Sequence, residues 1–211
     1  MNTLPLVSSL LSIVGRPAGF RLMMAAAAFG LLSAPAVQAQ AGAANLVPNG
    51  NLETPNAAGD WAANWGKAKI GQTSWEAEGG DHFIRMKATE PGKMMMIYNQ
   101  VGLNGAKAVE VTVKGRVSEL KKGAQSWFDA RVMLGFRDAG SQEIKGASKP
   151  VVFGKDTAGW EERKVSFAVP EGTVFLAIMP TLLNVETGTF DFTEISVKAI
   201  DPATLSAPAA K

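Results

Sequence analysis

Hydrophobic and polar residues alternate along much of the second half of the chain. In segment 107–118 the valines stand at odd-numbered positions, and the residues between them are mostly polar or charged. Successive side chains of a strand point to opposite faces, so this period of two predicts strands with one buried face. The same reasoning, extended to less regular apolar segments, predicts strands at 67–76, 82–89, 94–101, 107–118, 129–137, 161–169, 173–179 and 189–200.

Turn-forming residues separate these segments. A glycine marks each predicted turn, and the turns lie at 78–81, 90–93, 104–105, 121–123, 138–141, 156–159 and 170–172. Short strands with such regular turns, and no long amphipathic helix between them, predict an all-β fold, an antiparallel β-sandwich of the jelly-roll type. Residues 201–211 are rich in alanine and proline and are predicted to form a disordered tail.

The N-terminus has the pattern of an export signal. Arg16 and Arg21 precede an apolar run at 22–32, and small residues with cleavage-compatible spacing follow at 37–41. The run is shorter than the roughly 20 apolar residues that a membrane-spanning helix needs, although an uncleaved membrane anchor is the alternative. We therefore predict a signal peptide at 1–41 and a secreted or periplasmic protein with no membrane span after cleavage.

Without this segment the chain is formally neutral. Two of the 21 lysines and arginines lie in the predicted signal peptide, which leaves as many basic as acidic residues, since there are 19 aspartates and glutamates. A neutral surface gives no electrostatic attraction to nucleic acid, and neutral polysaccharide is a compatible partner. About 170 residues remain, enough for one domain with a substantial core and no disulfides. The absence of cysteine excludes thiol catalysis and cysteine-based zinc sites.

The first residues after the predicted signal peptide carry a distinctive motif. Residues 45–53 read Asn-Leu-Val-Pro-Asn-Gly-Asn-Leu-Glu, and Trp61 and Trp65 follow. This run resembles the opening strand of the galactose-binding-like β-sandwich modules, above all the jelly-roll carbohydrate-binding modules. In those modules a nearly identical run is followed by a tryptophan.

The C-terminal half agrees with this resemblance. Residues 159–167 read Gly-Trp-Glu-Glu-Arg-Lys-Val-Ser-Phe, 169–172 read Val-Pro-Glu-Gly, and 190–197 read Phe-Asp-Phe-Thr-Glu-Ile-Ser-Val. Their order is similar to the closing block of carbohydrate-binding modules of families four, nine and twenty-two. Residues 126–132 are similar to the non-catalytic modules that precede bacterial glycoside hydrolases. The resemblance covers 45–200 and implies a single jelly-roll domain that binds a polysaccharide or oligosaccharide.

The resemblance also bears on a metal site. The closing strand of the family carries an Asp-Asp pair, whose first member often helps to hold a structural calcium ion near the N-terminal strand. Here those positions are Thr193 and Glu194, so the pair is lost, while Glu53 and Asp191 could still supply oxygen ligands. A structural calcium ion at Glu53 and Asp191 is one expectation, and pairing of both carboxylates with backbone amides is the alternative. No other cofactor is predicted.

Sugar binding needs flat aromatic faces together with polar groups that hydrogen-bond to hydroxyls. Trp127, Asp129 and Arg131 are two residues apart, which aligns their side chains along one surface of a predicted strand. Tyr98 and Gln100 are expected to form a parallel row on a neighbouring strand. We expect these five residues to contact the ligand; a salt bridge between Asp129 and Arg131 is the structural alternative.

The other aromatic residues divide between ligand contact and packing. Trp61 and Trp75 are further candidate ligand residues, for which packing is an equal alternative. Trp65 and Trp160 occupy family positions next to turns, which favours a structural role. The methionines at 94–96 are expected to fill an edge or the core, because methionine adapts to irregular gaps.

Few residues suit catalysis. His82 is the only histidine, and the chain has no nucleophile-elbow, dinucleotide or phosphate-loop motif. Carboxylates of the kind that glycosidases use in pairs are present, but such pairs occur in any protein by chance. The leading hypothesis is therefore a non-catalytic carbohydrate-binding protein. The alternatives are an envelope structural or adhesion protein that uses the sandwich for protein contacts, and a small glycoside-cleaving enzyme.

Overall fold

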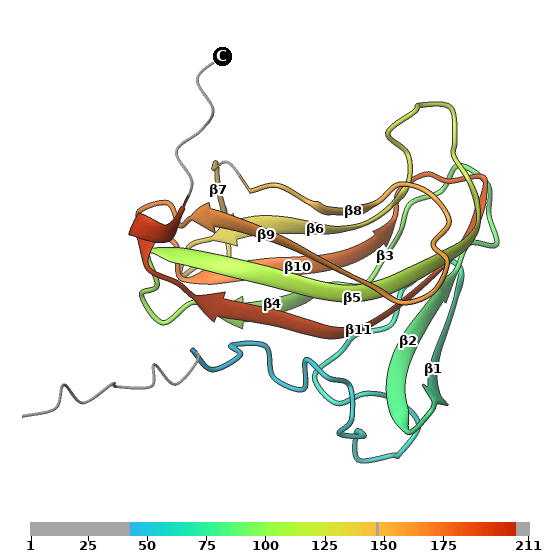
Figure 1. Cartoon of the computed structure of the whole chain (residues 1–211), viewed down its shortest axis with the longest axis horizontal. Coiled ribbons are helices and arrows are strands. Elements are labelled where there is room, and N and C mark those ends of the chain that lie inside the picture. Colours follow the sequence, from blue (N-terminus) through green and yellow to red (C-terminus); the bar gives the residue numbers. More distant parts are fainter. Residues whose placement is uncertain (1–42, 147, 206–211) are drawn as a thin grey trace, which may run out of the picture. The chain divides into compact units, whose positions relative to one another are not determined.

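In the computed structural model, residues 43–146 and 148–205 are described. The predicted signal peptide at 1–41 and the end of the predicted tail at 206–211 lie outside these ranges. The described part of the chain folds into two antiparallel β-sheets (Figure 1). Within that part, no helix has the length and hydrophobicity needed to cross a membrane. The prediction of an all-β sandwich is confirmed.

The first sheet has five strands in the order β1, β2, β11, β5, β9. Their bounds, in that order, are Gln72–Glu78, Asp81–Lys87, Thr187–Ala199, Ala108–Lys121 and Glu161–Ala168. All four pairings are antiparallel, and β11 is central, because it pairs with both β2 and β5. In Figure 1, β5, β9 and β11 run side by side, while the hairpin of β1 and β2 turns away at the lower right.

The second sheet is built around β10 (Phe175–Leu182) and β6 (Ala130–Arg137), which pair along their whole lengths. The other four strands are short and pair with one of these two. Along the free edge of β10 lie β3 (Met95–Met96) and β4 (Asn99–Gly102), and along the free edge of β6 lie β7 (Glu143–Ile144) and β8 (Val151–Phe153). This six-stranded sheet therefore has β10 and β6 as its centre.

The sequence pattern located the long strands and missed the short ones. The strand expected at 94–101 is broken into β3 and β4, because its partner strand contains Pro180, which has no N–H to continue the ladder. The strand expected from residue 67 begins only at Gln72. Two and three residues are too few to show a period, so β7 and β8 were not predicted.

The core lies between the two sheets and consists of the inward-facing residues of both. The alternating valines of β5 are buried, as the pattern predicted. Aromatic contacts join the sheets: the ring centroids of Phe153 and Phe190 lie 5.3 Å apart, and those of Phe136 and Phe167 lie 5.5 Å apart. Burying such a side chain contributes about 1.5–3 kcal/mol, so these contacts add to the many aliphatic ones that hold the layers together.

The N-terminal motif at 45–53 forms a series of turns, so the prediction that it is a strand was wrong. Asn45 takes the place of a strand residue beside β11: its side-chain oxygen accepts from the Val197 N–H at 2.9 Å, and its amide nitrogen donates to the Ile195 carbonyl at 3.1 Å. Gly50 lies so close that a Cβ there would stand 2.2 Å from the Ile195 oxygen. The motif therefore fastens the N-terminal segment to β11.

The same motif holds the residues that follow it. The Asn49 side chain donates to the carbonyls of Thr54 and Ala63, at 2.8 and 2.9 Å. The Asn49 carbonyl in turn accepts from the indole N–H of Trp65, which is buried. The structural role expected for Trp65 is thus confirmed, and the motif stabilises the fold.

The predicted tail is ordered where it is described. Pro202–Thr204 form one turn of 3₁₀ helix, η1, whose first residue is preceded by Asp201 as N-cap. The Asp201 carboxylate accepts from the Ala203 N–H at 2.9 Å, a usual way to satisfy a free N–H at a helix start. The expectation of disorder is therefore corrected for these residues.

Candidate functional site

The outer face of the five-stranded sheet is covered by ion pairs. Asp191 is 2% exposed, and its carboxylate accepts hydrogen bonds from Arg85 at 2.8 Å and from Arg116 at 2.7 Å. Glu76 and Glu78 each lie 2.7 Å from one of these two guanidinium groups. Hydrogen bonding to Asp191 raises the pKa of Arg85 further above its ordinary value. These five side chains form one network of two guanidinium groups and three carboxylates.

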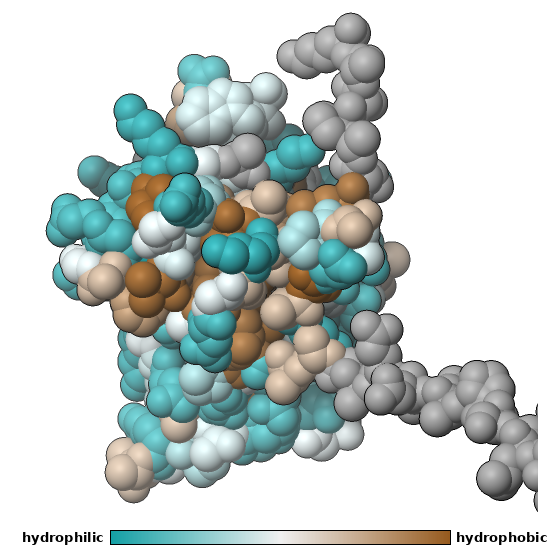
Figure 2. All heavy atoms as spheres, turned by 90° about the vertical axis from the view of Figure 1, so that its left-hand side faces the viewer, coloured by the Kyte–Doolittle hydropathy of each residue, from teal (hydrophilic) through white to brown (hydrophobic). Residues whose placement is uncertain are grey.

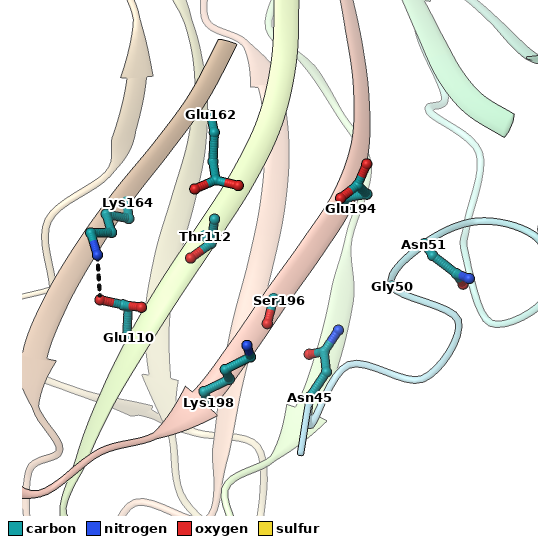
Figure 3. A pocket seen from close by; sticks show the side chains of 10 residues that line it. All are labelled: Asn45, Gly50, Asn51, Glu110, Thr112, Glu162, Lys164, Glu194, Ser196 and Lys198. Carbon is teal, nitrogen blue, oxygen red and sulfur yellow. Dashed lines mark ion pairs between the residues drawn. The ribbon is translucent and has the colours of Figure 1, made fainter. Parts of the chain in front are cut away.

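A polar groove of about 430 Å³ lies on the same face (Figure 3). Its side chains come from β5, β9, β11 and the N-terminal segment. Lys164 Nζ lies 3.1 Å from Glu110, and Glu194 lies 2.5 Å from Lys114 just beside the groove. None of the described residues that line it is aromatic. The groove therefore offers hydrogen bonds but no flat apolar surface.

The outer face of the six-stranded sheet has a different character. Four residues that pair across neighbouring strands form one row on this face. They are Met96, Thr181, Arg131 and Val152, from β3, β10, β6 and β8. Methionines 133 and 179 form the next pair, and both are half-buried. This face is thus more apolar than that of the five-stranded sheet.

A groove of about 590 Å³ lies at the β3–β4 edge of this sheet. It is lined by Gly66, Lys67, Lys69, Ile70, Met94, Met96 and Tyr98. Three of the five large hydrophobic side chains that are exposed in the described chain, Ile70, Met94 and Tyr98, meet there. We call this the edge groove; its volume is within the range of about 300–1,000 Å³ that ligand pockets usually have.

Local backbone geometry builds one wall of the edge groove. The chain before β1 passes so close to β3 that a Cβ on Gly71 would lie 2.6 Å from Met95 Sδ and 2.8 Å from the Lys87 oxygen. Gly71 also has a φ of +79°, which favours glycine. The close approach at residue 71 holds the preceding residues 66–70 beside β3 and β4.

Tyr98 forms the opposite wall of the edge groove, and a hydrogen bond to one neighbouring side chain fixes its hydroxyl. Its hydroxyl donates to the Gln100 side-chain oxygen at 2.7 Å, and Gln100 donates to the Ser141 hydroxyl at 3.3 Å. The ring is 46% exposed. Tyr98 and Gln100 share the outer face with Arg131 as predicted, but β10 lies between the two rows, so their strands are not neighbours.

Trp127 lies in the loop before β6 and is 54% exposed. Asp129 and Arg131, predicted to contact ligand, instead hold this loop: Arg131 Nε donates to Asp129 at 2.6 Å, and Arg131 Nη2 donates to the Trp127 carbonyl at 2.6 Å. The Asp129 side chain is only 4% exposed. The alternative of a salt bridge is thus the arrangement found, and both residues position the loop that carries Trp127.

Two other predicted ligand residues pack within the fold. Trp61 is 4% exposed, and its indole N–H donates to the Trp65 carbonyl at 2.8 Å, so the prediction of a ligand contact there is wrong. Trp75 is half-buried on β1, donates to the Leu52 carbonyl at 3.1 Å and stacks on the His82 ring at 4.4 Å. The Trp75 ring therefore already stacks on a side chain of the fold.

The two predicted calcium ligands have other partners. Asp191 binds two arginines, and Glu53 accepts hydrogen bonds from the His82 backbone N–H at 2.7 Å and lies 2.8 Å from His82 Nδ1. The His82 N–H is also the main reason that the pKa of Glu53 is lowered. Over residues 43–146 and 148–205, no three acidic or histidine side chains cluster as a metal site requires. Both carboxylates thus have partners among the described side chains, an arginine pair for Asp191 and His82 for Glu53.

Apolar side chains also occur on other parts of the surface. Figure 2 shows the side of the molecule that faces left in Figure 1, where apolar side chains lie among polar ones. Single exposed apolar residues are normal on protein surfaces, whereas a hollow that gathers several of them with an aromatic ring suggests binding. The edge groove has this combination.

Sequence reasoning identified Tyr98 and missed the rest of the edge groove. Lys67, Lys69 and Ile70 were assigned to a strand, and the methionines at 94–96 to filling. Met95 does fill the core, but Met94 is exposed and Met96 lines the groove. One feature of the sequence could have indicated the groove: the run of methionines at 94–96 ends two residues before the aromatic residue Tyr98.

Comparison with known proteins gives matches among solved structures. No protein-family model matches the chain, and a search of curated proteins finds no match. The enzymatically active domain of tailspike protein 4 from bacteriophage CBA120 is similar with a TM-score of 0.58 and 10% identity, over 74% of this chain and 21% of that one. This chain therefore spans about a fifth of the tailspike domain.

A carbohydrate-binding module of family 4 is similar over its whole length. The TM-score is 0.50 and the identity 14%, over 73% of this chain and 99% of the module. At such low identity both likenesses show the fold alone. The described chain has the jelly-roll sandwich fold of a carbohydrate-binding module, and this confirms the fold that the sequence resemblance implied.

Proposed function

We propose that this protein is a non-catalytic carbohydrate-binding module that is exported and binds a polysaccharide on the outer face of the six-stranded sheet. The observation that carries the proposal is the edge groove, where three of the five exposed large hydrophobic side chains meet. The family 4 module that shares the fold supports the proposal, because its description names carbohydrate binding.

The groove has the chemistry that a sugar ring needs. Tyr98 offers an aromatic face for the apolar C–H surface of a pyranose, and its hydroxyl keeps free acceptor capacity after donating to Gln100. Aromatic rings with one polar end are common where a surface must bind both apolar and hydroxyl groups. We infer that Tyr98 is the main platform.

Trp127 supplies a second aromatic side chain at the same end of the sheet. The start of β6, which follows the Trp127 loop, is aligned through Leu182 with Met95, beside the edge groove. Two strand spacings separate β3 from β6, about 10 Å, a distance that two or three sugar residues span. A saccharide chain that lies across the strands would contact both places.

Affinity electrophoresis tests the proposal. Native gels that contain soluble β-glucan, xylan, mannan or polygalacturonate should retard the protein in at least one case. Tyr98→Ala should weaken that retention about tenfold, since removing a central aromatic contact typically costs 1 kcal/mol or more. Val174→Ala, which shortens an exposed apolar side chain outside the groove, is the matched control and should leave it unchanged.

Two results would count against the proposal. Absence of retardation on every glycan, with the protein folded by its thermal transition, would contradict carbohydrate binding. Equal weakening by Tyr98→Ala and Val174→Ala would contradict the placement of the site in the edge groove.

A further inference from the structure

The edge groove is positively charged. Lys67 and Lys69 line it, and no acidic side chain of the described residues does. The polar groove on the five-stranded sheet differs, because lysines and three glutamates line it together. The formal neutrality of the chain outside the predicted signal peptide therefore hides a local excess of positive charge beside Tyr98.

Neither lysine is neutralised by a close ion pair. Lys67 lies 3.5 Å from Asp60, and both side chains are more than half exposed, so that the pair is weak. The pKa of Asp60 is lowered first by its hydrogen bond from Asn56, and the charge of Lys67 is a smaller cause. Lys69 has no ion pair with any described residue. The ammonium group of Lys69 is therefore available to a ligand, and that of Lys67 is shared with one exposed carboxylate.

Contact with Trp61 holds Lys67 in place. The Nζ atom lies 4.9 Å from the centre of the Trp61 ring, within the range of cation–π attraction. Trp61 is buried and fixed by its own hydrogen bond. A tryptophan that the sequence suggested as a ligand residue therefore helps to position a cation at the groove.

We propose that the edge groove binds a uronic acid residue of an acidic polysaccharide. This inference rests on the proposed function and names its ligand class. The pyranose ring would lie against Tyr98 and the methionine side chains, and the carboxylate would pair with Lys67 and Lys69. Met94 and Met96 adapt to the ring because methionine has flexible torsions and a polarisable sulfur.

Charge favours this ligand over a neutral sugar. A neutral pyranose would gain the apolar contact with Tyr98 but would form no ion pair with either lysine. Each carboxylate–lysine pair at a partly exposed site contributes about 0.2–1 kcal/mol, so two together favour the uronate by roughly two- to thirtyfold. The preference should decrease as salt concentration rises, because such pairs are screened.

Titration calorimetry with matched glycans tests the inference. The probes are oligogalacturonate, its carboxyl-reduced neutral counterpart, and polyglutamate as an anion without a sugar ring. The uronate should bind about tenfold more tightly than its reduced form at low salt. Lys67→Gln with Lys69→Gln should abolish this difference.

Lys198→Gln is the matched control, since it removes one positive charge from the polar groove on the other sheet. It should not change the preference for the uronate, and all variants should keep the thermal transition of the unaltered protein. Lys67 and Lys69 are exposed, so their replacement should not prevent folding.

The outcomes separate this inference from the proposed function. Equal binding of uronate and reduced glycan would overturn the inference and leave carbohydrate binding standing. A uronate preference that survives the double replacement would overturn the assignment to the edge groove. Binding of polyglutamate as tightly as uronate would show attraction of any anion and also overturn it. Failure of every glycan to bind would overturn both.

Discussion

The two outer faces of the sandwich use their side chains in different ways. On the five-stranded sheet, Asp191 is buried between two arginines, whose other partners are glutamates, so each of these charges has an oppositely charged partner within the fold. On the six-stranded sheet, the edge groove leaves Tyr98 and two lysines exposed. The Asp191 network is thus closed by internal ion pairs, whereas the edge groove exposes an aromatic ring and two lysines.

This contrast separates stability from binding. A buried charge with hydrogen-bonded partners is costly to leave unmatched, so changes on the five-stranded face should alter the free energy of unfolding. An exposed ring in a groove adds little to folding, so changes there should alter affinity. Three predictions test this separation.

The largest effect is expected from Asp191→Asn. The substitution removes the charge shared by Arg85 and Arg116 and should lower the free energy of unfolding by about 2–3 kcal/mol, somewhat less than for a fully buried pair because both arginines are partly exposed. Urea unfolding measures it. Glu194→Gln, on the same strand and in an exposed pair, should cost less than about 1 kcal/mol.

Glycan affinity of the folded Asp191→Asn protein should equal that of the unaltered protein. If affinity fell with stability, the two faces would be coupled and the contrast between them would fail.

A smaller effect is expected from Trp127→Ala, and here affinity should change more than stability. The side chain is exposed, and the loop is held by its carbonyl and by Asp129 and Arg131, so unfolding should change by less than about 0.5 kcal/mol. Affinity for a long glycan should decrease about three- to tenfold, and affinity for a disaccharide should not change. A large loss of stability would instead assign Trp127 to packing.

The smallest effect concerns pH. The folded-state pKa of Glu53 lies below its ordinary value, so the stabilisation it contributes is present above pH 4.5 and is lost as pH falls through the lowered folded value. Because the side chain is more than a third exposed, the contribution is only a few tenths of a kcal/mol. Glu53→Gln should make the free energy of unfolding less dependent on pH between about 5 and 3.

Glu143→Gln, at a more exposed carboxylate, is the control and should leave that pH dependence unaltered. A Glu53→Gln protein with the same acid sensitivity as the original would show that the contact with His82 does not stabilise the fold.

The period-two pattern predicted the fold well because one face of each long strand must be buried. In β5 the buried valines alternate with polar residues along the strand, and β6 and β9 show the same alternation. Strand breaks were less predictable, since the interruption between β3 and β4 depends on Pro180, about 80 residues away in the chain.

The motif at 45–53 was correctly linked to this fold and wrongly read as a strand. The Asn45 side chain copies the hydrogen bonds of a strand residue, and the backbone that follows forms turns. Residue types reveal such a role only when the partner strand is known, and here the partner is β11 at the other end of the chain. The motif therefore identified the fold and not the ligand contacts.

The two-residue spacing correctly placed the side chains of Asp129 and Arg131 next to each other. It did not predict whether they bind a ligand or other residues of the fold. In the structure they bind each other and the Trp127 carbonyl. Trp61 shows the same limit, because a tryptophan after a turn suits a surface or a core equally well, and only its neighbours bury it. Exposure depends on partners that are distant in sequence.

By itself the sequence determined an all-β sandwich with a packed core, because local periodicity reflects the burial of one strand face. Tertiary structure alone decided which aromatic and charged side chains remained exposed. The edge groove joins residues 66–70 to 94–98 through the close approach of Gly71 to Met95, and no local pattern encodes that approach. Cohesion between the sheets is a sum over many similar apolar contacts, whereas a binding groove depends on a few specific long-range ones.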